Sequence, residues 1–355
     1  MLRRMSFAWA ALLLFCTGAH GEKSKSQDLE VSANSAEYIT YEDDELTQDE
    51  LVPVRGWTRL YADSARSIKG WARWWKYLGL KQRLVMKWKY GLSLVIYPGN
   101  EMYRALFVRG IYNPNLAMLI RSLLFPGSVF IDVGANFGDM SLLASRIVGS
   151  NGHVYALEPS SRDFERLREN VNRNGLQDSI STYRLALFER SQKVQLRIAG
   201  EERSGLNTLG LEISSKGVEE MAVEEVEACT LDEFVAKEKI LRVDLLKLDI
   251  EGSELYALRG AARTILNYRP VLVLGVNHSS LKSCGADYSS LQRLIHSMKY
   301  KMYGITEKPA FALEPIQDLT RTGPGIVVCL PEGIATPTLP QPSGWQILGK
   351  KICAK

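Results

Sequence analysis

Residues 129–138 constrain the fold of this chain more than any other stretch. They begin as an apolar run that carries Asp132, and they continue into a turn that contains Gly134 and Gly138. An apolar run of this length next to glycine is typical of a parallel strand that is covered on both faces. A glycine turn between a strand and a helix lets the backbone approach a ligand at the helix N-terminus. The stretch therefore predicts a strand–turn–helix unit with a binding site at the turn.

Strands and helices alternate after this unit. Helices are expected at residues 140–148 and 290–297, from a capping-box-like start at Ser160, and after Ser253. Further strands are expected at residues 153–158, 180–187, 194–198, 223–229, 245–249 and 270–276, with closing strands up to residue 330. This alternation is typical of an α/β protein with a doubly wound, largely parallel sheet.

The first 21 residues have the features of a secretory signal peptide. Arg3 and Arg4 form a charged start, residues 7–15 are apolar, and Ala19 and Gly21 supply small residues for cleavage. The apolar run is short for a transmembrane helix, although a retained signal anchor is the alternative. We therefore expect the protein in the secretory pathway or outside the cell, or anchored to a membrane through residues 1–21.

Two segments of opposite charge follow. Residues 22–54 are polar and acidic, which predicts a disordered linker. Residues 55–127 form a basic, Trp-rich N-terminal subdomain, in which Trp71, Trp74 and Trp75 fall at helical spacing. Residues 55–90 could contact an anionic membrane surface, bind an acidic or carbohydrate substrate, or pack an aromatic helix face on the main domain. The main domain is expected at residues 128–334 and a loosely attached tail at 335–355.

Composition adds two limits. The formal net charge is +4 over 355 residues, which is too small to imply a nucleic-acid partner. Four cysteines remain beyond the signal segment, and they either form two disulfides, in one of three pairings, or serve as small core residues. Their spacing does not predict a zinc site. These cysteines are Cys229, Cys284, Cys329 and Cys353.

Polar side chains follow four of the expected strands. Asp132, Glu158, Asp249 with Glu251, and Asn277 with His278 each stand where a strand ends. Ligands of open α/β sheets bind beyond the carboxyl ends of the strands. One acid at one strand end would mean little, but the whole set predicts a binding site along this edge.

The first two of these acids indicate the kind of ligand. Gly134 and Gly138 do not form the GxGxxG pattern of a dinucleotide site, and Glu158 lies 20 residues after Gly138, where a carboxylate can accept both hydroxyls of a ribose. Asp132 would orient an amino group, while Asn136 and Gly138 would shape the turn around a carboxylate end. S-adenosyl-L-methionine combines these features, and we predict it as the cofactor, bound by Asp132, Gly134, Asn136, Gly138 and Glu158.

The remaining strand-end residues are the candidates for catalysis. Asp249 and Glu251 are two residues apart, so an extended backbone would point both to one face. There they would bind a divalent metal or deprotonate a substrate hydroxyl, and we favour the second role and predict no metal. His278 would act as a base or hold the hydroxyl, or it would be a packing residue. Lys247 is expected to be structural or to position substrate.

These motifs resemble the FkbM family of S-adenosylmethionine-dependent methyltransferases. The resemblance covers roughly residues 92–330, and it is most specific at residues 246–254, Leu-Lys-Leu-Asp-Ile-Glu-Gly-Ser-Glu. It implies a Rossmann-like, seven-stranded class I methyltransferase fold with an antiparallel last strand. It also implies O-methylation, commonly of sugar or natural-product hydroxyls. One position departs from the family, because Gly275 stands where an acid is usual, which raises the weight of Asn277 and His278.

We therefore predict an O-methyltransferase that acts on a hydroxyl of a sugar, glycan, lipid or natural product. Two alternatives stay open: a non-catalytic lumenal or membrane-associated module that keeps the fold, and an oxidoreductase with a nucleotide cofactor. Asn277-His278-Ser279 is formally an N-glycosylation sequon. We expect Asn277 to be unmodified, because a glycan in the cleft would block it.

Overall fold

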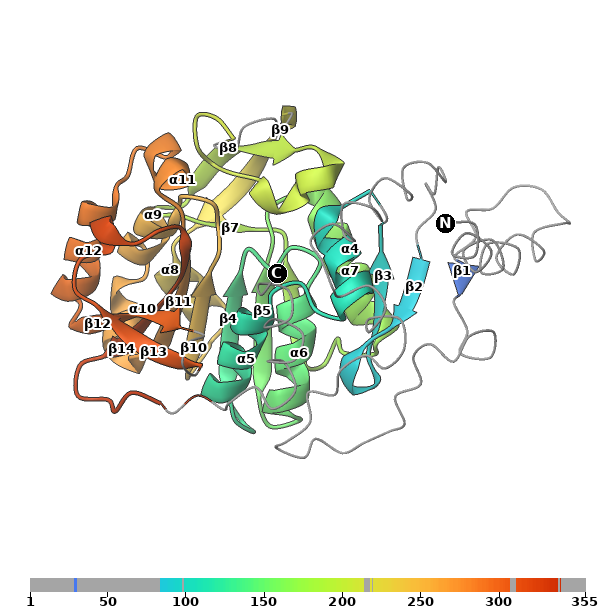
Figure 1. Ribbon diagram of the computed structural model, residues 1–355, viewed down its shortest axis with the longest axis horizontal. Coiled ribbons are helices and arrows are strands. Elements are labelled where there is room, and N and C mark those ends of the chain that lie inside the picture. Colours follow the sequence, from blue (N-terminus) through green and yellow to red (C-terminus); the bar gives the residue numbers. More distant parts are fainter. Residues whose placement is uncertain are drawn as a thin grey trace, which may run out of the picture.

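The computed structural model describes residues 29–30, 84–97, 99–213, 218, 220–306, 311–337 and 339 (Figure 1). The predicted signal segment, all of the acidic segment except residues 29–30, and residues 55–83 with Trp71, Trp74 and Trp75 lie outside these residues. The structure therefore bears mainly on the α/β domain and on the chain immediately before it.

A mixed sheet forms the centre of the domain. Its order is β13-β12-β14-β11-β10-β4-β5-β6, in which β11, β10, β4, β5 and β6 run parallel and β14 runs antiparallel to both of its neighbours. The predicted Rossmann-like methyltransferase fold is confirmed, and β13 adds an eighth strand at the edge. The strands are β4 (Val129–Val133), β5 (His153–Leu157), β6 (Ile180–Tyr183), β10 (Leu245–Leu248), β11 (Val271–Val276), β12 (Tyr300–Thr306), β13 (Ala312–Ile316) and β14 (Gly325–Pro331).

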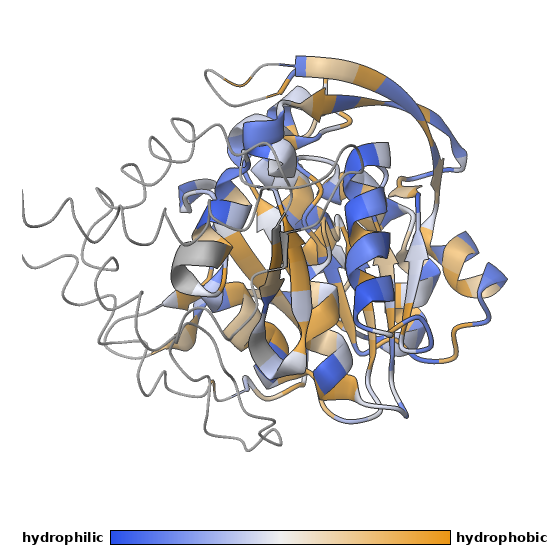
Figure 2. Cartoon of the chain, turned by 90° about the vertical axis from the view of Figure 1, so that its right-hand side faces the viewer, coloured by the Kyte–Doolittle hydropathy of each residue, from blue (hydrophilic) through white to orange (hydrophobic). Residues whose placement is uncertain are grey.

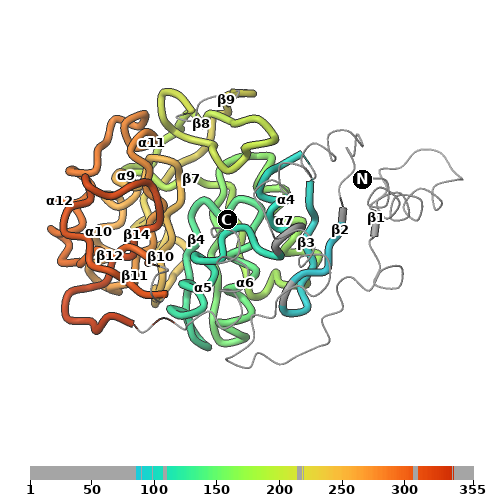
Figure 3. The backbone as a smooth tube through the Cα atoms, viewed as in Figure 1, coloured from blue at the N-terminus to red at the C-terminus, as the bar shows by residue number. Residues whose placement is uncertain are grey.

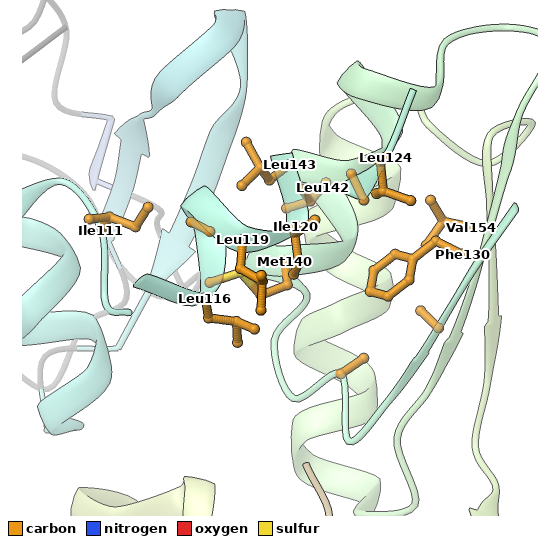
Figure 4. Packing of buried hydrophobic residues seen from close by; sticks show 14 of the residues in the cluster. Ile111, Leu116, Leu119, Ile120, Leu124, Phe130, Met140, Leu142, Leu143 and Val154 are labelled. Atoms are coloured by element: carbon orange, nitrogen blue, oxygen red, sulfur yellow. The ribbon is translucent and has the colours of Figure 1, made fainter. Parts of the chain in front are cut away.

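Helices cover both faces of this sheet, which explains the continuous apolar runs of its strands. Successive residues of β4 enter opposite cores, since Phe130 belongs to one cluster and Ile131 to the other. Figure 4 shows the first cluster, where Phe130 and Val154 face the side chains of α5 and α6. The helices are α5 (Pro114–Leu123), α6 (Asp139–Val148), α7 (Ser161–Arg173), α8 (Leu231–Lys237), α9 (Glu254–Arg259), α10 (Ala262–Tyr268), α11 (His278–Ser283) and α12 (Tyr288–Ser297).

The chain before β4 packs along α7. The hairpin of β2 (Leu84–Lys87) and β3 (Ser93–Ile96) is followed by α4 (Glu101–Arg109), and β3 is held by two side chains of α7. Asn170 Oδ1 accepts a hydrogen bond from the backbone N–H of Val95 at 2.8 Å, and Asn174 Oδ1 accepts one from Ser93 at 2.7 Å. The coloured strands beside α7 in Figure 3 show this arrangement. These contacts place α4 and the loop after it beside the sheet edge.

A second, smaller sheet lies beyond the carboxyl ends of the strands, in the order β7-β9-β8. The strand expected at 180–187 is divided, because β6 joins the central sheet whereas β7 (Ala186–Leu187) pairs with β9 (Glu220–Cys229). β8 (Gln192–Ala199) forms a long antiparallel ribbon with β9, and a 3-10 helix, η3 (Glu201–Leu206), follows it. Figure 2 shows how hydrophilic and apolar residues mix along this ribbon, while the interior strands are mainly apolar.

The structure also bears on the acidic segment, on the cysteines and on membrane-spanning helices. A short strand, β1 (Leu29–Glu30), pairs with β2 inside the segment expected to be a disordered linker, and the rest of that segment lies outside the described residues. Cys229, Cys284 and Cys329 are free thiols, which contradicts the two-disulfide alternative, whereas Cys353 lies outside the described residues. No helix in the described part of the chain is long and apolar enough to span a bilayer.

Candidate active site

A pocket opens at the carboxyl ends of β4, β5 and β10, at the edge where the sequence predicted a site. It contains about 920 Å³ of space, counting the part that opens to solvent. Its lining comes from the glycine turn, from the turn after β10, from the α4–α5 region and from the loop around η3. The lining residues include Met102, Tyr112, Asn113, Leu116, Gly134, Asn136, Asp139, Glu158, Ser204, Asn207, Lys247, Asp249 and Glu251.

The glycine turn after β4 is sterically fixed. Gly134 has φ of 72°, and a Cβ there would lie 2.1 Å from the backbone oxygen of Asp249. Gly138 has φ of 90°, and its Cβ would lie 2.5 Å from Leu167 Cδ1. Only glycine meets both demands. Asn136 also adopts a positive φ, 50°, which asparagine tolerates better than most residues, and it lines the pocket beside Gly134.

Glu158 holds this turn from the end of β5. Its Oε2 accepts a hydrogen bond from Asn136 N at 2.9 Å, and its Oε1 accepts one from Ser160 N at 2.9 Å. Burial and the nearby charge of Asp163 raise its pKa, while these two N–H groups oppose the rise. Each carboxylate oxygen keeps a further lone pair. The side chain lines the pocket, so it can accept hydroxyl hydrogen bonds from a ligand without giving up the turn.

Asp132 has a different place from the one expected. It is fully buried, and among the described residues it is not one that lines the pocket. Its Oδ1 accepts a hydrogen bond from Lys247 Nζ at 2.8 Å, and its Oδ2 accepts one from Ser141 Oγ at 2.6 Å. Direct contact of Asp132 with a cofactor amino group, as the sequence suggested, does not fit this geometry. Lys247 has the structural role that was one of its two expected roles.

Lys247 links β10 to the glycine turn. Its Nζ also donates to the backbone oxygen of Gly134 at 3.1 Å, and its side chain is almost completely buried. Burial lowers its pKa, but Asp132 and Asp249 outweigh that effect, and the pKa is raised overall. The lysine therefore stays charged and neutralises Asp132.

Asp249 and Glu251 both line the pocket, although not by the extended geometry expected. The strand ends at Leu248, and Glu251 stands in a turn with φ of 47°. Ser280 Oγ donates to Glu251 Oε2 at 3.0 Å. Burial and the charge of Asp249 raise the pKa of Glu251 to about 7. A carboxylate with this pKa, next to a more exposed one, is suited to accept a proton near neutral pH.

Glu254, the first residue of α9, holds the turn after β10 through hydrogen bonds. We did not predict this role. Its Oε1 accepts hydrogen bonds from the backbone N–H groups of Ile250 and Gly252, both at 3.2 Å. Gly252 is required here, since a Cβ would lie 2.1 Å from the backbone oxygen of Ser280. An acid in the first turn of α9 was a visible signal, because helix N-termini favour acids.

The structure does not bring Asn277 and His278 into the pocket. Asn277 is the N-cap of α11, where its Oδ1 accepts from Ser279 N at 2.9 Å. His278 is exposed, and its ring lies edge-on to Tyr288 with 5.3 Å between centroids. The predicted catalytic role of His278 therefore lacks geometric support. The expectation that Asn277 is unglycosylated because it lines the cleft also loses its basis.

A wall of the pocket comes from residues to which the sequence gave no site role, although residues 110–114 belong to the resemblance to the FkbM family. Met102, Tyr112 and Asn113 approach from the α4–α5 region, and Ser204 and Asn207 approach from around η3. The two segments are joined, because Asn100 Nδ2 donates to Ser204 Oγ at 2.6 Å. Burial, together with Glu101 and Asp249, raises the pKa of Tyr112 to about 12, so its hydroxyl stays protonated.

The titratable side chains that line the pocket are mainly acidic. Asp139, Glu158, Asp249 and Glu251 line it, while Lys247 is the only basic side chain among the described lining residues and is already paired with Asp132. A ligand that brings positive charge fits such a site. S-adenosyl-L-methionine, with its sulfonium and ammonium groups, meets this requirement. Among the described residues, no three or more His, Cys, Asp or Glu side chains lie together in a way that could hold a metal ion.

Comparison with known proteins identifies the domain. Residues 132–302 match the family model described as "Methyltransferase FkbM domain". The chain contains an FkbM methyltransferase domain. Its methyltransferase class and its S-adenosyl-L-methionine cofactor, both expected from the sequence, are thereby confirmed, which argues against the oxidoreductase alternative. The matched range contains the glycine turn, Glu158 and the turn after β10, but not the wall contributed by Met102 and Tyr112.

Individual relatives are distant from this FkbM domain protein. The chain is 23% identical over 184 residues to the hexuronic acid methyltransferase AglP of Haloferax volcanii, covering 52% of this chain and 70% of that protein. It is 40% identical over 60 residues to a probable cobalt-precorrin-6B C(15)-methyltransferase of Sulfolobus acidocaldarius, covering 17% of this chain and 31% of that protein. The match thus spans less than a third of the Sulfolobus protein.

Among solved structures, the chain is similar to the methyltransferase FkbM of Methylobacillus flagellatus KT. The TM-score is 0.37 at 17% identity, and the match covers 64% of this chain and 54% of that chain. A SAM-dependent O-methyltransferase of Thermotoga maritima matches with a TM-score of 0.35 at 12% identity, covering 71% of this chain and 78% of that chain.

Proposed function

We propose that this FkbM domain O-methylates a hydroxyl group of a sugar or glycan acceptor. The observation that carries the proposal is the pair Asp249 and Glu251. These acids line the same pocket as the cofactor residues, and they are presented by the turn after β10 and not by the glycine turn. The match to a hexuronic acid methyltransferase supports an acceptor of the sugar class. A lipid or natural product that bears a hydroxyl is chemically equivalent at the reacting atom.

The cofactor residues divide the pocket into two parts. Glu158 would accept the ribose hydroxyls, because it lines the pocket and each of its oxygens keeps a lone pair beside the backbone N–H that it accepts. Gly134 and Asn136 would contact the remainder of the cofactor through their backbone. Asp249, Glu251 and Tyr112 are then left for the acceptor.

When bound, S-adenosyl-L-methionine supplies an electrophilic methyl group on a positively charged sulfur. The pocket has to hold the acceptor oxygen in line behind that carbon, and such orientation contributes roughly 7–11 kcal/mol to rate acceleration. The acceptor oxygen would take the methyl group as the C–S bond breaks and S-adenosylhomocysteine leaves, and the hydroxyl proton would pass to the carboxylate of Glu251 or Asp249. Removing that proton is worth on the order of a hundred- to ten-thousand-fold in rate.

A methyl-transfer assay with labelled cofactor and fractionated neutral and acidic glycans tests the proposal. We expect Asp249→Asn and Glu251→Gln to lower turnover by about 10²- to 10⁴-fold, with S-adenosylhomocysteine affinity changed less than about threefold. Asp318→Asn, which removes an exposed carboxylate beside η4 (Leu319–Arg321), is the matched control. Wild-type turnover in both pocket variants, or a product methylated on nitrogen or carbon, would contradict it.

The pH dependence of turnover gives a second test. The pKa of Glu251 is about 7, and a general base works only in its deprotonated form. Turnover at saturating substrate should therefore rise with pH up to about 7 and level off above it. In Glu251→Gln this rise should disappear from the residual activity. An unchanged pH profile in the variant would remove Glu251 from the proton transfer.

We also propose that residues 1–21 direct the protein into the secretory pathway and that residues 55–90 touch a membrane surface. The charged and apolar pattern of the first segment and the basic, Trp-rich character of the second support this. Fractionation of cells that express the full chain, against a variant lacking residues 1–21, tests the first part. Equal distribution of both proteins would contradict it.

A further inference from the structure

We propose that Asp139, and not Asp132 as expected from the sequence, binds the ammonium group of the methionine moiety of S-adenosyl-L-methionine. The inference rests on the methyltransferase activity and assigns a residue within its cofactor site. Asp139 is the first residue of α6, directly after Gly138 of the glycine turn. It lines the pocket together with Gly134, Asn136 and Glu158.

The carboxylate of Asp139 has a free acceptor that faces no protein donor. Its Oδ1 accepts a hydrogen bond from Met140 N at 2.9 Å. Its Oδ2 is buried and has no hydrogen-bond partner among the described residues. The whole residue is only 6% exposed. A buried carboxylate oxygen without a donor is unfavourable in a folded protein, and a cationic ligand would remove the cost.

Asp132 is not placed for this role, because it does not line the pocket and each of its oxygens already accepts a hydrogen bond from a protein group. Lys247 Nζ lies 2.8 Å from Oδ1, and Ser141 Oγ lies 2.6 Å from Oδ2. The lysine charge also cancels the charge of Asp132. Asp139 is therefore the acid next to the glycine turn that lines the pocket and keeps an unpaired oxygen.

The charges around Asp139 agree with a cationic partner. Asp132 on β4 and Asp249 after β10 repel its negative form, while Lys247 on β10 and the N–H of Met140 favour it. Tyr112 lines the pocket from the loop between α4 and α5, and its hydroxyl stays protonated. Burial is the largest influence, and the pKa of Asp139 is raised to about 7. A bound ammonium group would restore the ionised form.

A role in proton transfer suits Asp139 less well than it suits the acids after β10. A general base has to exchange its proton with solvent after each turnover, and Asp139 is enclosed whereas Asp249 is exposed. Helix preference also gives no reason for the burial, since an acid at the first turn serves equally well when it faces water. Binding a cation accounts for both the enclosure and the unpaired oxygen.

Three ligands separate the contacts. S-adenosylhomocysteine carries the ammonium and carboxylate groups, S-adenosyl-3-thiopropylamine carries the ammonium alone, and 5′-methylthioadenosine carries neither. Binding affinities are measured by calorimetry. Asp139→Asn should lower the affinity for S-adenosylhomocysteine and for the thiopropylamine by about 10- to 100-fold, and it should change the affinity for 5′-methylthioadenosine by less than about twofold. Glu158→Gln is the matched comparison, and it should weaken all three because it acts at the ribose.

The pH dependence adds a readout that a structural defect would not mimic. In the wild type, the ratio of S-adenosylhomocysteine affinity to 5′-methylthioadenosine affinity should rise between about pH 6 and pH 8, as Asp139 ionises. In Asp139→Asn the ratio should be flat. The ratio cancels the titration of Glu158, since both ligands contain the ribose.

Each outcome decides the proposal. Equal affinities of wild type and Asp139→Asn for S-adenosylhomocysteine would overturn it, and so would equal losses for all three ligands. A loss for S-adenosylhomocysteine with none for the thiopropylamine would assign Asp139 to the carboxylate side and would also overturn it. Failure of the wild type to bind any of the three would instead remove the cofactor assignment itself.

Discussion

The ends of β4 and β10 look alike in the sequence and differ in the structure. Each strand delivers an Asp followed by a glycine turn, with Gly134 after Asp132 and Gly252 after Asp249. Asp132 still lies within its strand, where the register pairs it with Lys247 of β10. Asp249 lies one residue beyond its strand, and it is exposed in the pocket. In the register of the two strands, Asp249 lies two residues beyond the position opposite Asp132, and this offset separates an acid that stabilises the fold from an acid that can meet a substrate.

The difference follows from parallel pairing. Because Lys247 and Asp132 are cross-strand partners, their side chains lie on the same face and meet as a buried ion pair. Such a pair adds little net stability, yet breaking it leaves a buried charge without a partner. Asp249 has lost its strand partner and can face the pocket instead. The acid of β4 is thus a part of the scaffold, and the acid of β10 is a part of the site.

The largest effect is expected when the scaffold pair is broken. Lys247→Met should lower the free energy of unfolding by about 3–5 kcal/mol, because Asp132 is left charged and fully buried. For a domain of this size, each kcal/mol lowers the melting temperature by roughly 2–4 °C. Thermal unfolding followed by circular dichroism measures the change.

A double variant checks the cause of that loss. Adding Asp132→Asn to Lys247→Met removes the unpaired charge and keeps an acceptor for Ser141 Oγ, which now donates to Asp132. We expect the double variant to recover at least half of the lost stability. No recovery would mean that Lys247 acts through its contact with Gly134 O and not through Asp132.

The sequence predicted the scaffold of this site better than its chemistry. Apolar runs and glycines placed β4, β5 and β10 because covered parallel strands need continuous apolar residues, and Gly134 needs a positive φ. The burial of Asp132 depends on the β4–β10 register, which no local pattern contains. Asp139 was missed for a related reason: an acid at a helix start usually faces solvent, whereas tertiary packing buries this one beside the pocket.

A middle-sized effect is expected at Gly275, the position that departs from the family pattern. A Cβ there would lie 2.1 Å from Asp249 Oδ1 and 2.8 Å from its Cγ, so the glycine makes room for that carboxylate. Gly275→Ala should displace Asp249 and lower kcat/KM by about 10- to 100-fold. S-adenosylhomocysteine affinity should be unchanged. Steady-state kinetics with the identified acceptor, together with calorimetry, measure both quantities.

Gly325→Ala is the control for this substitution. Gly325 lies on the adjacent strand β14, opposite Val276, and a Cβ there would meet nothing within 4 Å. It should keep wild-type kinetics. Wild-type kinetics in Gly275→Ala as well would show that Asp249 does not need its present position, and it would weaken the contrast between the two strand ends.

The smallest effect is expected at His278, which the sequence placed in the catalytic group. The residue follows β11 as Asp249 follows β10, yet it starts a helix and turns toward Tyr288 instead of the pocket. His278→Ala should change turnover by less than about twofold and stability by less than about 1 kcal/mol, since it removes one exposed ring contact. Asp249→Asn, measured in parallel, supplies the catalytic defect for comparison. A tenfold loss of turnover in His278→Ala, at unchanged cofactor affinity, would mean that α11 moves His278 into the pocket when the acceptor binds.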